Sequence, residues 1–470
     1  MSRRSRSPRR TVVKIGGSLL TEGQDLLDLA QVVASRRAAG EQVLLVTSAL
    51  RGVTDLIERS LWRAQGSVPT ESGEGSPLAA ALAWRHGKAA EQINPNDERL
   101  ATTLEQRIAE VDALIERARR LGLSRENQVR LLSYGERLSA PLVAAALRAA
   151  GVDTRSVTSE EIGLRGHGAS RAGSCDLVTS RAGVESAARE LAQRVLVVTG
   201  FYGVREDGQV VLFGRGGSDY SASVLASLLE PSRLELWKDV PGVFTANPKR
   251  VAGARLVTEI SYDEASALGG YGARILHPYC LQPLRGQAVT AIVVAGHPAQ
   301  EPSGGTRLVE ARRGPVSRVA ALAVRAPRTV VRVTGGRFDD ESRAAGRMLD
   351  ELGRDGFPLD AVSVSHDSLC FSIVDDRPYE ASRMLRSLNG HKAGKVQVRQ
   401  FPAWLGVVGD QVATNGHARA AVRETLDSLG IASAIEVLQQ DATVLRCRVE
   451  RDELRPLLRA LHGRLFETSG

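Results

Sequence analysis

The chain has 470 residues, of which 43% are hydrophobic and 25% charged, a composition typical of globular proteins with two or more domains. The formal net charge of +8 falls to +3 when the five arginines of the first ten residues are set aside, so no nucleic-acid partner is expected. No stretch approaches the roughly 18 consecutive apolar residues of a membrane span, and so no membrane partner is expected either.

The first ten residues contain only Ser, Arg and Pro after Met1, which predicts a disordered, solvated tail. This tail lacks the apolar segment of a secretory signal, and we expect a cytoplasmic protein. The four cysteines and eight histidines are scattered without the spacing of metal ligands, so no metal held by the protein alone is expected.

The elements begin with a β-branched strand at 11–15, a helix at 25–39 and an apolar strand at 43–47. This alternation predicts an open, mainly parallel α/β sheet between helices. A break rich in Gly, Ser and Pro follows at 66–77. Further helices are predicted at 54–66, 97–121, 136–150 and 222–229, and further strands at 195–199, 210–213, 234–237 and 291–294.

A different pattern of strands and helices follows a Gly- and Pro-rich linker at 299–315. Within 316–470 the apolar runs predict two ferredoxin-like βαββαβ repeats. The first spans 329–400, and the second starts at 404 but is one strand short. We expect the segment 316–324 to supply the missing edge strand, which interleaves the two repeats. The predicted organisation is therefore a tail at 1–10, a domain at 11–298, the linker and a two-module region at 316–470.

Small and hydroxylated residues follow the first two predicted strands. Lys14-Ile-Gly-Gly-Ser18 places a cation beside Gly16 and Gly17, which allow a phosphate to approach the backbone, although the spacing is not that of a Walker A loop. Ser48 ends the second strand, at the edge where α/β sheets bind ligands. Thr54 lies beyond it, and it serves either as a helix cap or as a ligand contact.

The segment Gly214-Arg-Gly-Gly-Ser-Asp219 is the most informative of the chain. Its glycine-rich turn leads into a helix, so free backbone N–H groups and a positive helix end favour an anion there. Arg215 offers a planar fork for a carboxylate. Asp219 is placed to orient a cation. The segment predicts chemistry on an acidic substrate.

Three other segments carry candidate site residues. Ser133-Tyr-Gly-Glu136 is predicted to open a helix, where Glu136 is either a surface residue matched to the helix dipole or a partner of a substrate ammonium. The loop at 236–249 combines Lys238, Asp239, Phe244 and Lys249, which suits a nucleotide but equally a plain turn. The segment 272–278 adds the cation Arg274.

In this order, these segments resemble the aspartate kinase family within the amino-acid kinase fold. The matching blocks are Lys-Ile-Gly-Gly-Ser, Val-Thr-Ser-Ala, Gly-Glu, Gly-Arg-Gly-Gly-Ser-Asp, Trp-Lys-Asp-Val-Pro-Gly and Gly-Ala-Arg-Ile-Leu-His-Pro, at 14–18, 46–49, 135–136, 214–219, 237–242 and 272–278. The resemblance covers about residues 11–310. The C-terminal repeats resemble the paired ACT modules of the family, and the chain ends at Gly470 without a homoserine dehydrogenase extension, so a monofunctional enzyme is expected.

The resemblance implies ATP-dependent phosphorylation of L-aspartate to 4-phospho-L-aspartate, the first step toward lysine, threonine and methionine, with Mg²⁺ carried on the nucleotide phosphates. It assigns a catalytic role to Lys14, Asp219 and Arg274. It assigns amino-acid binding to Ser48, Thr54, Glu136, Arg215 and Ser218. It assigns nucleotide binding to Gly16, Gly17, Lys238, Asp239, Phe244, Lys249 and Arg274. Because the attacking carboxylate is already ionised, no catalytic histidine is expected.

The sequence departs from the family pattern mainly on the nucleotide side. Lys238 stands for the usual Thr, Phe244 for Tyr, Asn247-Pro-Lys249 for Asp-Pro-Arg, and Arg274 for Lys. These differences motivate an alternative, a catalytically weak homologue that acts as an amino-acid-binding regulatory or sensor protein. A kinase for another acidic amino acid is a third hypothesis. The ACT resemblance implies an amino-acid effector (lysine or threonine) and a homodimer or higher homo-oligomer, with the segment 363–368 as a candidate effector contact or a polar turn.

Overall fold

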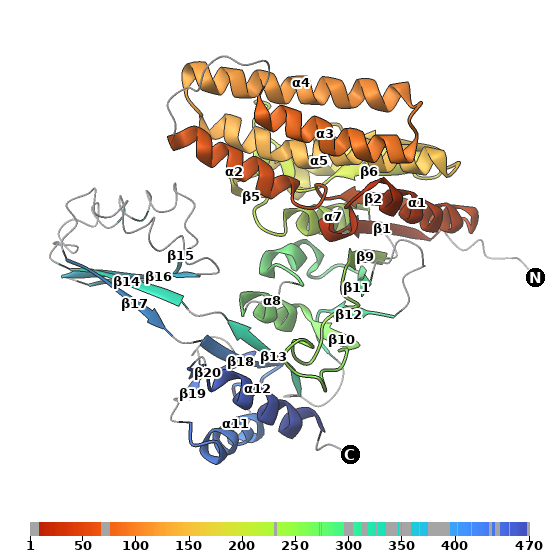
Figure 1. Ribbon diagram of the computed structural model, residues 1–470. Coiled ribbons are helices and arrows are strands. Elements are labelled where there is room, and N and C mark those ends of the chain that lie inside the picture. Colours follow the sequence, from red (N-terminus) through yellow and green to blue (C-terminus); the bar gives the residue numbers. More distant parts are fainter. Residues whose placement is uncertain are drawn as a thin grey trace, which may run out of the picture. The chain divides into compact units, whose positions relative to one another are not determined.

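The computed structural model describes residues 9–66, 76–229, 233–271, 273, 275–295, 304–312, 318–325, 328–334, 346, 349, 359–365, 367–374, 395–401, 403–414, 416–431, 435–437, 442–450 and 452–467 (Figure 1). The chain divides into two compact units. The first comprises Met1–Val243, Leu256–Ser266 and Arg274–Arg313, and the second comprises Phe244–Arg255, Ala267–Ala273 and Gly314–Gly470. The short segment Phe244–Arg255 thus groups with the C-terminal part of the chain. The predicted linker at 299–315 overlaps residues outside the described part.

The first unit is built on an eight-stranded sheet in the order β10-β12-β11-β9-β1-β2-β6-β3. The six neighbouring strands from β11 to β3 run parallel to one another. The strand β12 pairs antiparallel with β11 and parallel with β10. The strands are β1 (Arg10–Ile15), β2 (Gln42–Thr47), β3 (Thr154–Val157), β6 (Val195–Thr199), β9 (Arg233–Lys238), β10 (Glu259–Ser261), β11 (Thr290–Ala295) and β12 (Thr306–Val309). Small hairpins join β4 (Gly166–Ala169) to β5 (Ala172–Cys175) and β7 (Tyr202–Val204) to β8 (Val210–Leu212).

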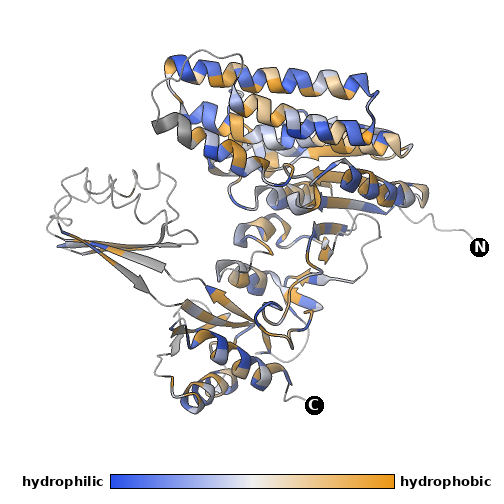
Figure 2. Ribbon diagram, viewed as in Figure 1, coloured by the Kyte–Doolittle hydropathy of each residue, from blue (hydrophilic) through white to orange (hydrophobic). Residues whose placement is uncertain are grey.

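Helices cover this sheet. The strands β2 and β6 are buried at every position, which requires that both faces be covered. The helices of the first unit are α1 (Gly23–Ala38), α2 (Val53–Gly66), α3 (Pro77–Ile93), α4 (Glu98–Leu121), α5 (Arg125–Ala149), α6 (Leu177–Glu190) and α7 (Gly217–Leu229). The helix α8 (Tyr262–Gly270) begins in the first unit, and its last four residues group with the second. One buried cluster joins side chains of α1 to α5 with Val13, Val43 and Val197 of the sheet. The outermost helix, α4, is hydrophilic over much of its length (Figure 2).

Two helices differ from the prediction. The helix α3 was not predicted, although Pro77 stands at its first position and the Ser76 hydroxyl accepts a hydrogen bond from the Leu78 N–H at 3.2 Å, a regular start signal. The helix α5 begins at Arg125, capped by Ser124, rather than at Glu136. The prediction that Glu136 opens a helix is therefore wrong, because this residue lies three turns inside α5 and is buried.

The second unit contains two four-stranded antiparallel sheets. Their orders are β13-β18-β20-β19 and β15-β16-β14-β17, each the 4-1-3-2 order of a ferredoxin-like module. The elements are β13 (Val319–Arg325), β14 (Arg328–Thr334), β15 (Leu359–Ser365), β16 (Ser368–Val374), β17 (Lys395–Phe401), β18 (Ala403–Gly409), β19 (Ile435–Val437), β20 (Val444–Val449), α11 (Gly416–Ser428) and α12 (Leu454–His462). The edge pairing of β13 with β18 confirms that the strand before the first module completes the second. The helix predicted at 340–353 lies outside the described residues except for 346 and 349, which are helical, and the helix predicted at 379–388 lies wholly outside them.

A buried ion cluster fixes β9 within the first unit. Glu235 is fully buried, and its carboxylate accepts hydrogen bonds from Arg36 to both oxygens at 2.9 Å and from the Trp237 indole at 2.9 Å. Arg233 pairs with the same carboxylate at 2.9 Å. Among the residues that the structure describes, each helix is too short or too polar to serve as a membrane span.

We expect Glu235→Ala to lower the free energy of unfolding by about 3–5 kcal/mol, because it leaves two guanidinium groups without this buried carboxylate. Urea unfolding followed by circular dichroism measures the loss. Glu185→Ala, which changes a half-exposed pair with Arg181 on α6, serves as the control and is expected to change stability by less than about 0.5 kcal/mol. Equal losses in both variants would contradict the structural role of the cluster.

Candidate active site

The candidate site lies at the carboxyl edge of the parallel strands. Lys14 is the fifth residue of β1, and it is in register with Val46 of β2 on one side and Leu236 of β9 on the other. The first turn of α7 reaches the same edge with Asp219. Strand order thus brings together residues that are far apart in the sequence.

Two lysines converge on one carboxylate at this edge. The Lys14 ammonium lies 2.7 Å from Oδ1 of Asp219, and the Lys238 ammonium lies 2.6 Å from Oδ2. Burial by itself would raise the pKa of Asp219, but the two ammonium groups outweigh it and hold that pKa at about 2. Burial lowers the pKa of Lys14, whereas Asp219 outweighs burial at Lys238 and raises its pKa. The cluster carries one excess positive charge where an anion can approach.

The glycine pair of the β1 turn is packed against backbone. A Cβ on Gly16 would lie 2.9 Å from the Trp237 carbonyl oxygen, and one on Gly17 would lie 2.9 Å from the Ala49 carbonyl oxygen. The Gly16 N–H donates to the Trp237 carbonyl at 3.0 Å. Side chains are therefore excluded at both positions of this turn, which directly follows the strand that carries Lys14.

Glu136 is a buried carboxylate with spare acceptor capacity. Its Oε1 accepts from the Ala49 N–H at 3.1 Å and from the Ser218 hydroxyl at 3.3 Å. Its Oε2 is buried and has no hydrogen-bond partner among the described residues. Burial raises the pKa of Glu136 to about 8, despite these hydrogen bonds and the nearby Lys14. The surface-residue interpretation of Glu136 is wrong, and the site offers an acceptor for a cation.

Two consecutive residues of α7 link Glu136 to the cluster of Lys14, Lys238 and Asp219. Ser218 donates to Glu136, while Asp219 pairs with both lysines. The first turn of α7 also brings the positive end of the helix dipole to this point. A ligand that spans the two groups would therefore meet a carboxylate at one end and a cationic cluster at the other.

The other predicted amino-acid contacts lie in the turn before α7, after β2 and in α2. Arg215 is exposed in the turn before α7. The pKa of the half-buried His277 is lowered, mainly by burial and then by the charge of Arg215. Both Gly214 and Gly216 in this turn have a φ of +71°. Ser48 is partly exposed after β2, and Thr54 is the second residue of α2, inside the helix rather than at its cap.

The predicted nucleotide residues fall into three groups. In the first unit, Lys238 is the last residue of β9 and pairs with Asp219, and Asp239 follows the strand and is exposed. Phe244 and Lys249 belong to the segment that groups with the second unit. Arg274 lies outside the described residues. Of the three groups, the described residues show an ion pair with Asp219 for Lys238, and Lys14 pairs with the same carboxylate.

A supporting network next to Glu136 was not predicted. Arg137 pairs with Glu160 at 2.7 Å and stacks on the Tyr202 ring at 4.7 Å, and the Tyr202 hydroxyl donates to Glu160 at 2.9 Å. These contacts hold the α5 backbone at Glu136. The only sequence signal for Arg137 was its position next to Glu136. Nothing in the sequence around Glu160 pointed to its pairing with Arg137.

The family model described as "Amino acid kinase family" matches residues 9–295, which is more than half of the chain. The chain belongs to the amino acid kinase family. Within that family it belongs to the aspartokinases, since it is 31% identical over 312 residues to an aspartokinase of Geobacillus stearothermophilus, covering 64% of this chain and 73% of the relative.

Solved structures of this family share the fold over nearly the whole chain. Escherichia coli aspartokinase III in complex with lysine and aspartate matches with a TM-score of 0.77 and 22% identity, over 97% of this chain and 99% of that one. The same protein with aspartate and ADP matches with a TM-score of 0.73 and 24% identity, over 97% and 99%. These similarities confirm the predicted fold class, an amino-acid kinase sheet followed by two ferredoxin-like ACT modules.

Proposed function

We infer that the chain is an aspartate kinase, which transfers the γ-phosphoryl group of ATP to the side-chain carboxylate of L-aspartate. The observation that carries this inference is the link between Ser218 and Asp219, which joins the buried acceptor Glu136 to the cationic cluster at Lys14. Support comes from the aspartokinase relative and from the fold shared with aspartokinase III, solved with aspartate and ADP. The sensor alternative has no support in these comparisons.

On the amino-acid side, the α-ammonium of aspartate would bind the free Oε2 of Glu136. Arg215 would bind a substrate carboxylate through its guanidinium fork, since its side chain is exposed at the neighbouring turn. Ser48, Thr54 and Ser218 would complete the amino-acid contacts. This arrangement directs the side-chain carboxylate of the substrate toward Lys14.

On the phosphoryl side, an oxygen of the aspartate side chain attacks the γ-phosphorus, and the bond from that phosphorus to the β,γ-bridging oxygen breaks. The products are 4-phospho-L-aspartate and ADP, and no proton transfer is needed. Lys14, held by Asp219, neutralises charge as two anions approach each other. The backbone of Gly16 and Gly17 lets the phosphates come close.

The nucleotide would further contact Lys238, Asp239, Phe244, Lys249 and Arg274. Among the residues that the structure describes, no group of three His, Cys, Asp or Glu side chains forms a metal site. Both oxygens of Asp219 are already paired with lysines, so Mg²⁺ fits here only as an ion carried on the nucleotide phosphates. When bound, it would neutralise phosphate charge.

Regulation is the proposed role of the second unit. The two ACT-like modules would bind lysine or threonine as a feedback inhibitor in a homodimer or larger homo-oligomer, since aspartokinase III was solved with lysine. The candidate effector segment 363–368 spans the turn between β15 and β16. In that turn the Ser365 and Ser368 hydroxyls lie 2.7 Å apart in a hydrogen bond.

The test of the function is trapping of the acyl phosphate with hydroxylamine, which yields aspartyl hydroxamate. We expect ATP-dependent product with L-aspartate and at least a hundredfold less with L-glutamate. Product with glutamate alone would favour the third hypothesis. Absence of product with both amino acids, together with calorimetric binding of aspartate, would favour the sensor alternative.

Lys238 offers a sharper test of the nucleotide side. We expect Lys238→Met to raise the KM for ATP about tenfold, because one charge-assisted contact to phosphate is lost, and to change the KM for aspartate less than twofold. Steady-state kinetics with each substrate varied separates these effects. The matched control, Lys88→Met, removes an exposed lysine of α3 and should change neither constant. A rise confined to aspartate would contradict the assignment.

A further inference from the structure

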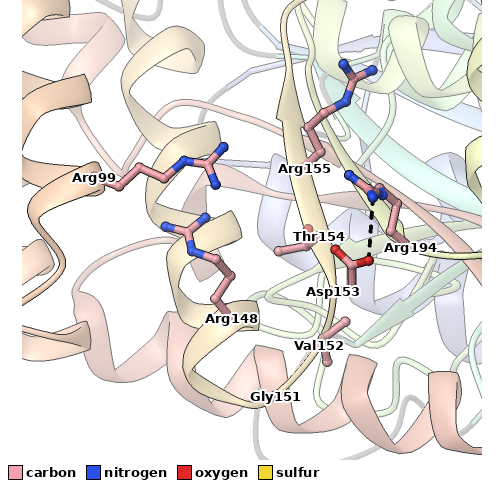
Figure 3. Close-up of a pocket in the computed structure, with 8 residues that line it drawn as sticks. All are labelled: Arg99, Arg148, Gly151, Val152, Asp153, Thr154, Arg155 and Arg194. Atoms are coloured by element: carbon pink, nitrogen blue, oxygen red, sulfur yellow. Dashed lines mark ion pairs between the residues drawn. The ribbon is translucent and has the colours of Figure 1, made fainter.

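A concave site lies at the edge of the sheet opposite the candidate active site. It is a cavity of about 410 Å³, lined by Arg99, Arg148, Gly151, Val152, Asp153, Thr154, Arg155 and Arg194 (Figure 3). Thr154 begins β3 and Arg194 directly precedes β6. Since β3, β6, β2 and β1 are parallel, these amino ends lie at the edge away from Lys14.

Four arginines from separate elements meet at this cavity. Arg99 stands in the first turn of α4 and Arg148 in the last turn of α5. Arg155 lies in β3, and Arg194 precedes β6. Figure 3 shows Arg99 and Arg148 on the side of the two helices and Arg155 and Arg194 on the side of the sheet. The fold therefore assembles guanidinium groups from both sides of the cavity.

Carboxylates occupy only part of the donor capacity of these arginines. One terminal nitrogen is used in each of three pairs: Arg148 with Asp97 at 2.8 Å, Arg155 with Glu190 at 2.9 Å and Arg194 with Asp153 at 3.6 Å. The Nε atoms of Arg155 and Arg194 are buried and have no hydrogen-bond partner among the described residues. Each guanidinium has five N–H donors, so most of them remain available.

Arg99 gives the group its excess charge. Four arginines face three carboxylates, and the side chain of Arg99 is exposed, with no hydrogen bond or ion pair to another described residue. A cation at the end of α5 compensates the helix dipole, which explains Arg148. It does not explain the convergence of Arg99, Arg155 and Arg194 on the same space.

We propose that this cavity binds a small polyphosphate anion through its di- or triphosphate chain. Guanidinium groups bind phosphate oxygens in pairs, and the volume is in the range of small-ligand sites. Val152 is the only apolar side chain among the lining residues, and none of them is aromatic. The cavity therefore offers charge to phosphates but no stacking surface to a nucleobase.

The test is calorimetric titration of sodium pyrophosphate into the full chain at about 50 mM salt, where phosphate contacts are weakly screened, with hydrogen exchange of the same samples to locate the binding. We expect slower exchange in peptides covering 148–156 and 190–195. Arg99→Gln breaks no ion pair, and Arg155→Gln breaks only a partly exposed one, so both variants should fold. Each is expected to weaken pyrophosphate binding about tenfold.

The matched control is Arg181→Gln, which removes an exposed arginine of α6 and should leave the affinity unchanged. The same protection with ADP would identify the diphosphate of a nucleotide as a source of the ligand, and protection with pyrophosphate alone would identify a free polyphosphate. The proposal is overturned if protection appears only at 14–17 and 214–219. It is also overturned if Arg99→Gln and Arg155→Gln bind like the wild type, or if Arg181→Gln weakens binding as much as they do.

Discussion

Replacement of Lys14 by alanine is expected to lower kcat for aspartyl phosphate formation by about 10³-fold or more, because its buried ammonium is the group proposed to neutralise charge during phosphoryl transfer. In the folded protein this ammonium is fixed 2.7 Å from Asp219, so it is oriented before the substrates bind. An effect on kcat rather than on binding alone is expected, since charge develops around the transferred group during the reaction.

The fold should survive this substitution. Asp219 keeps Lys238 at 2.6 Å, so its buried carboxylate is not left without a cation. Hydroxamate formation and circular dichroism are measured on the same preparation, with Lys88→Ala on α3 as the control. Folded Lys14→Ala protein with turnover within tenfold of the wild type would remove Lys14 from the catalytic group.

Glu136→Gln is expected to raise the KM for aspartate at least about 100-fold, since the amide cannot supply the negative charge that pairs with the substrate ammonium. The amide oxygen can still accept from Ala49 and Ser218, so the local hydrogen bonds are retained. Initial rates with aspartate varied give the measurement, and Glu185→Gln on α6 is the control. An unchanged KM would show that the ammonium binds elsewhere.

The same variant should alter the dependence of stability on pH. Burial raises the pKa of Glu136 to about 8 from an ordinary value of 4.5, so between these pH values the folded state holds a proton that the unfolded state has released. The free energy of unfolding therefore falls as the pH rises through this window, by on the order of 3–5 kcal/mol. The amide of the Glu136→Gln variant has no such proton, and we expect the stability of this variant relative to wild type to increase up to pH 8.

Urea unfolding of both proteins at pH 5, 7 and 8.5 tests this linkage. A constant difference between them would show that Glu136 is already ionised in the folded state. Aspartate binding provides a second readout, because a substrate ammonium favours the ionised carboxylate. Calorimetry at pH 7 in buffers of different ionisation enthalpy should then reveal proton release on binding.

Strand alternation was sufficient to predict the α/β sheet and the completed second ACT-like module. A buried strand such as β2 is recognised by its continuous apolar run. The second repeat has one strand too few, so a strand from outside it, β13, was needed at its edge. The missed helix α3 shows the limit. Its start signal at Ser76 and Pro77 directly follows a segment rich in Gly and Ser, which obscured the helix that it opens.

The sequence singled out the residues proposed for the site but not the pairs that they form. Asp219 and Lys238 were singled out separately, yet their ion pair depends on the packing of the first turn of α7 against the end of β9. Glu136 was mistaken for a helix-opening residue because the polar start of α5 hides the true cap, Ser124. Its orphaned oxygen and shifted pKa arise from burial, which no local sequence pattern reports.

The grouping of Phe244–Arg255 with the C-terminal unit has a consequence for exchange of parts between relatives. Ala246 and Val251 belong to the same buried cluster as Leu405 and Leu461, and the Thr245 hydroxyl bonds the His462 ring at 2.9 Å. A chimaera with a single crossover near residue 314 would therefore combine an insert from one parent with the core of another. The second unit also includes Ala267–Ala273, so a hybrid that inherits this unit whole needs four additional junctions, two around each inserted segment. It is inherited as a discontinuous piece.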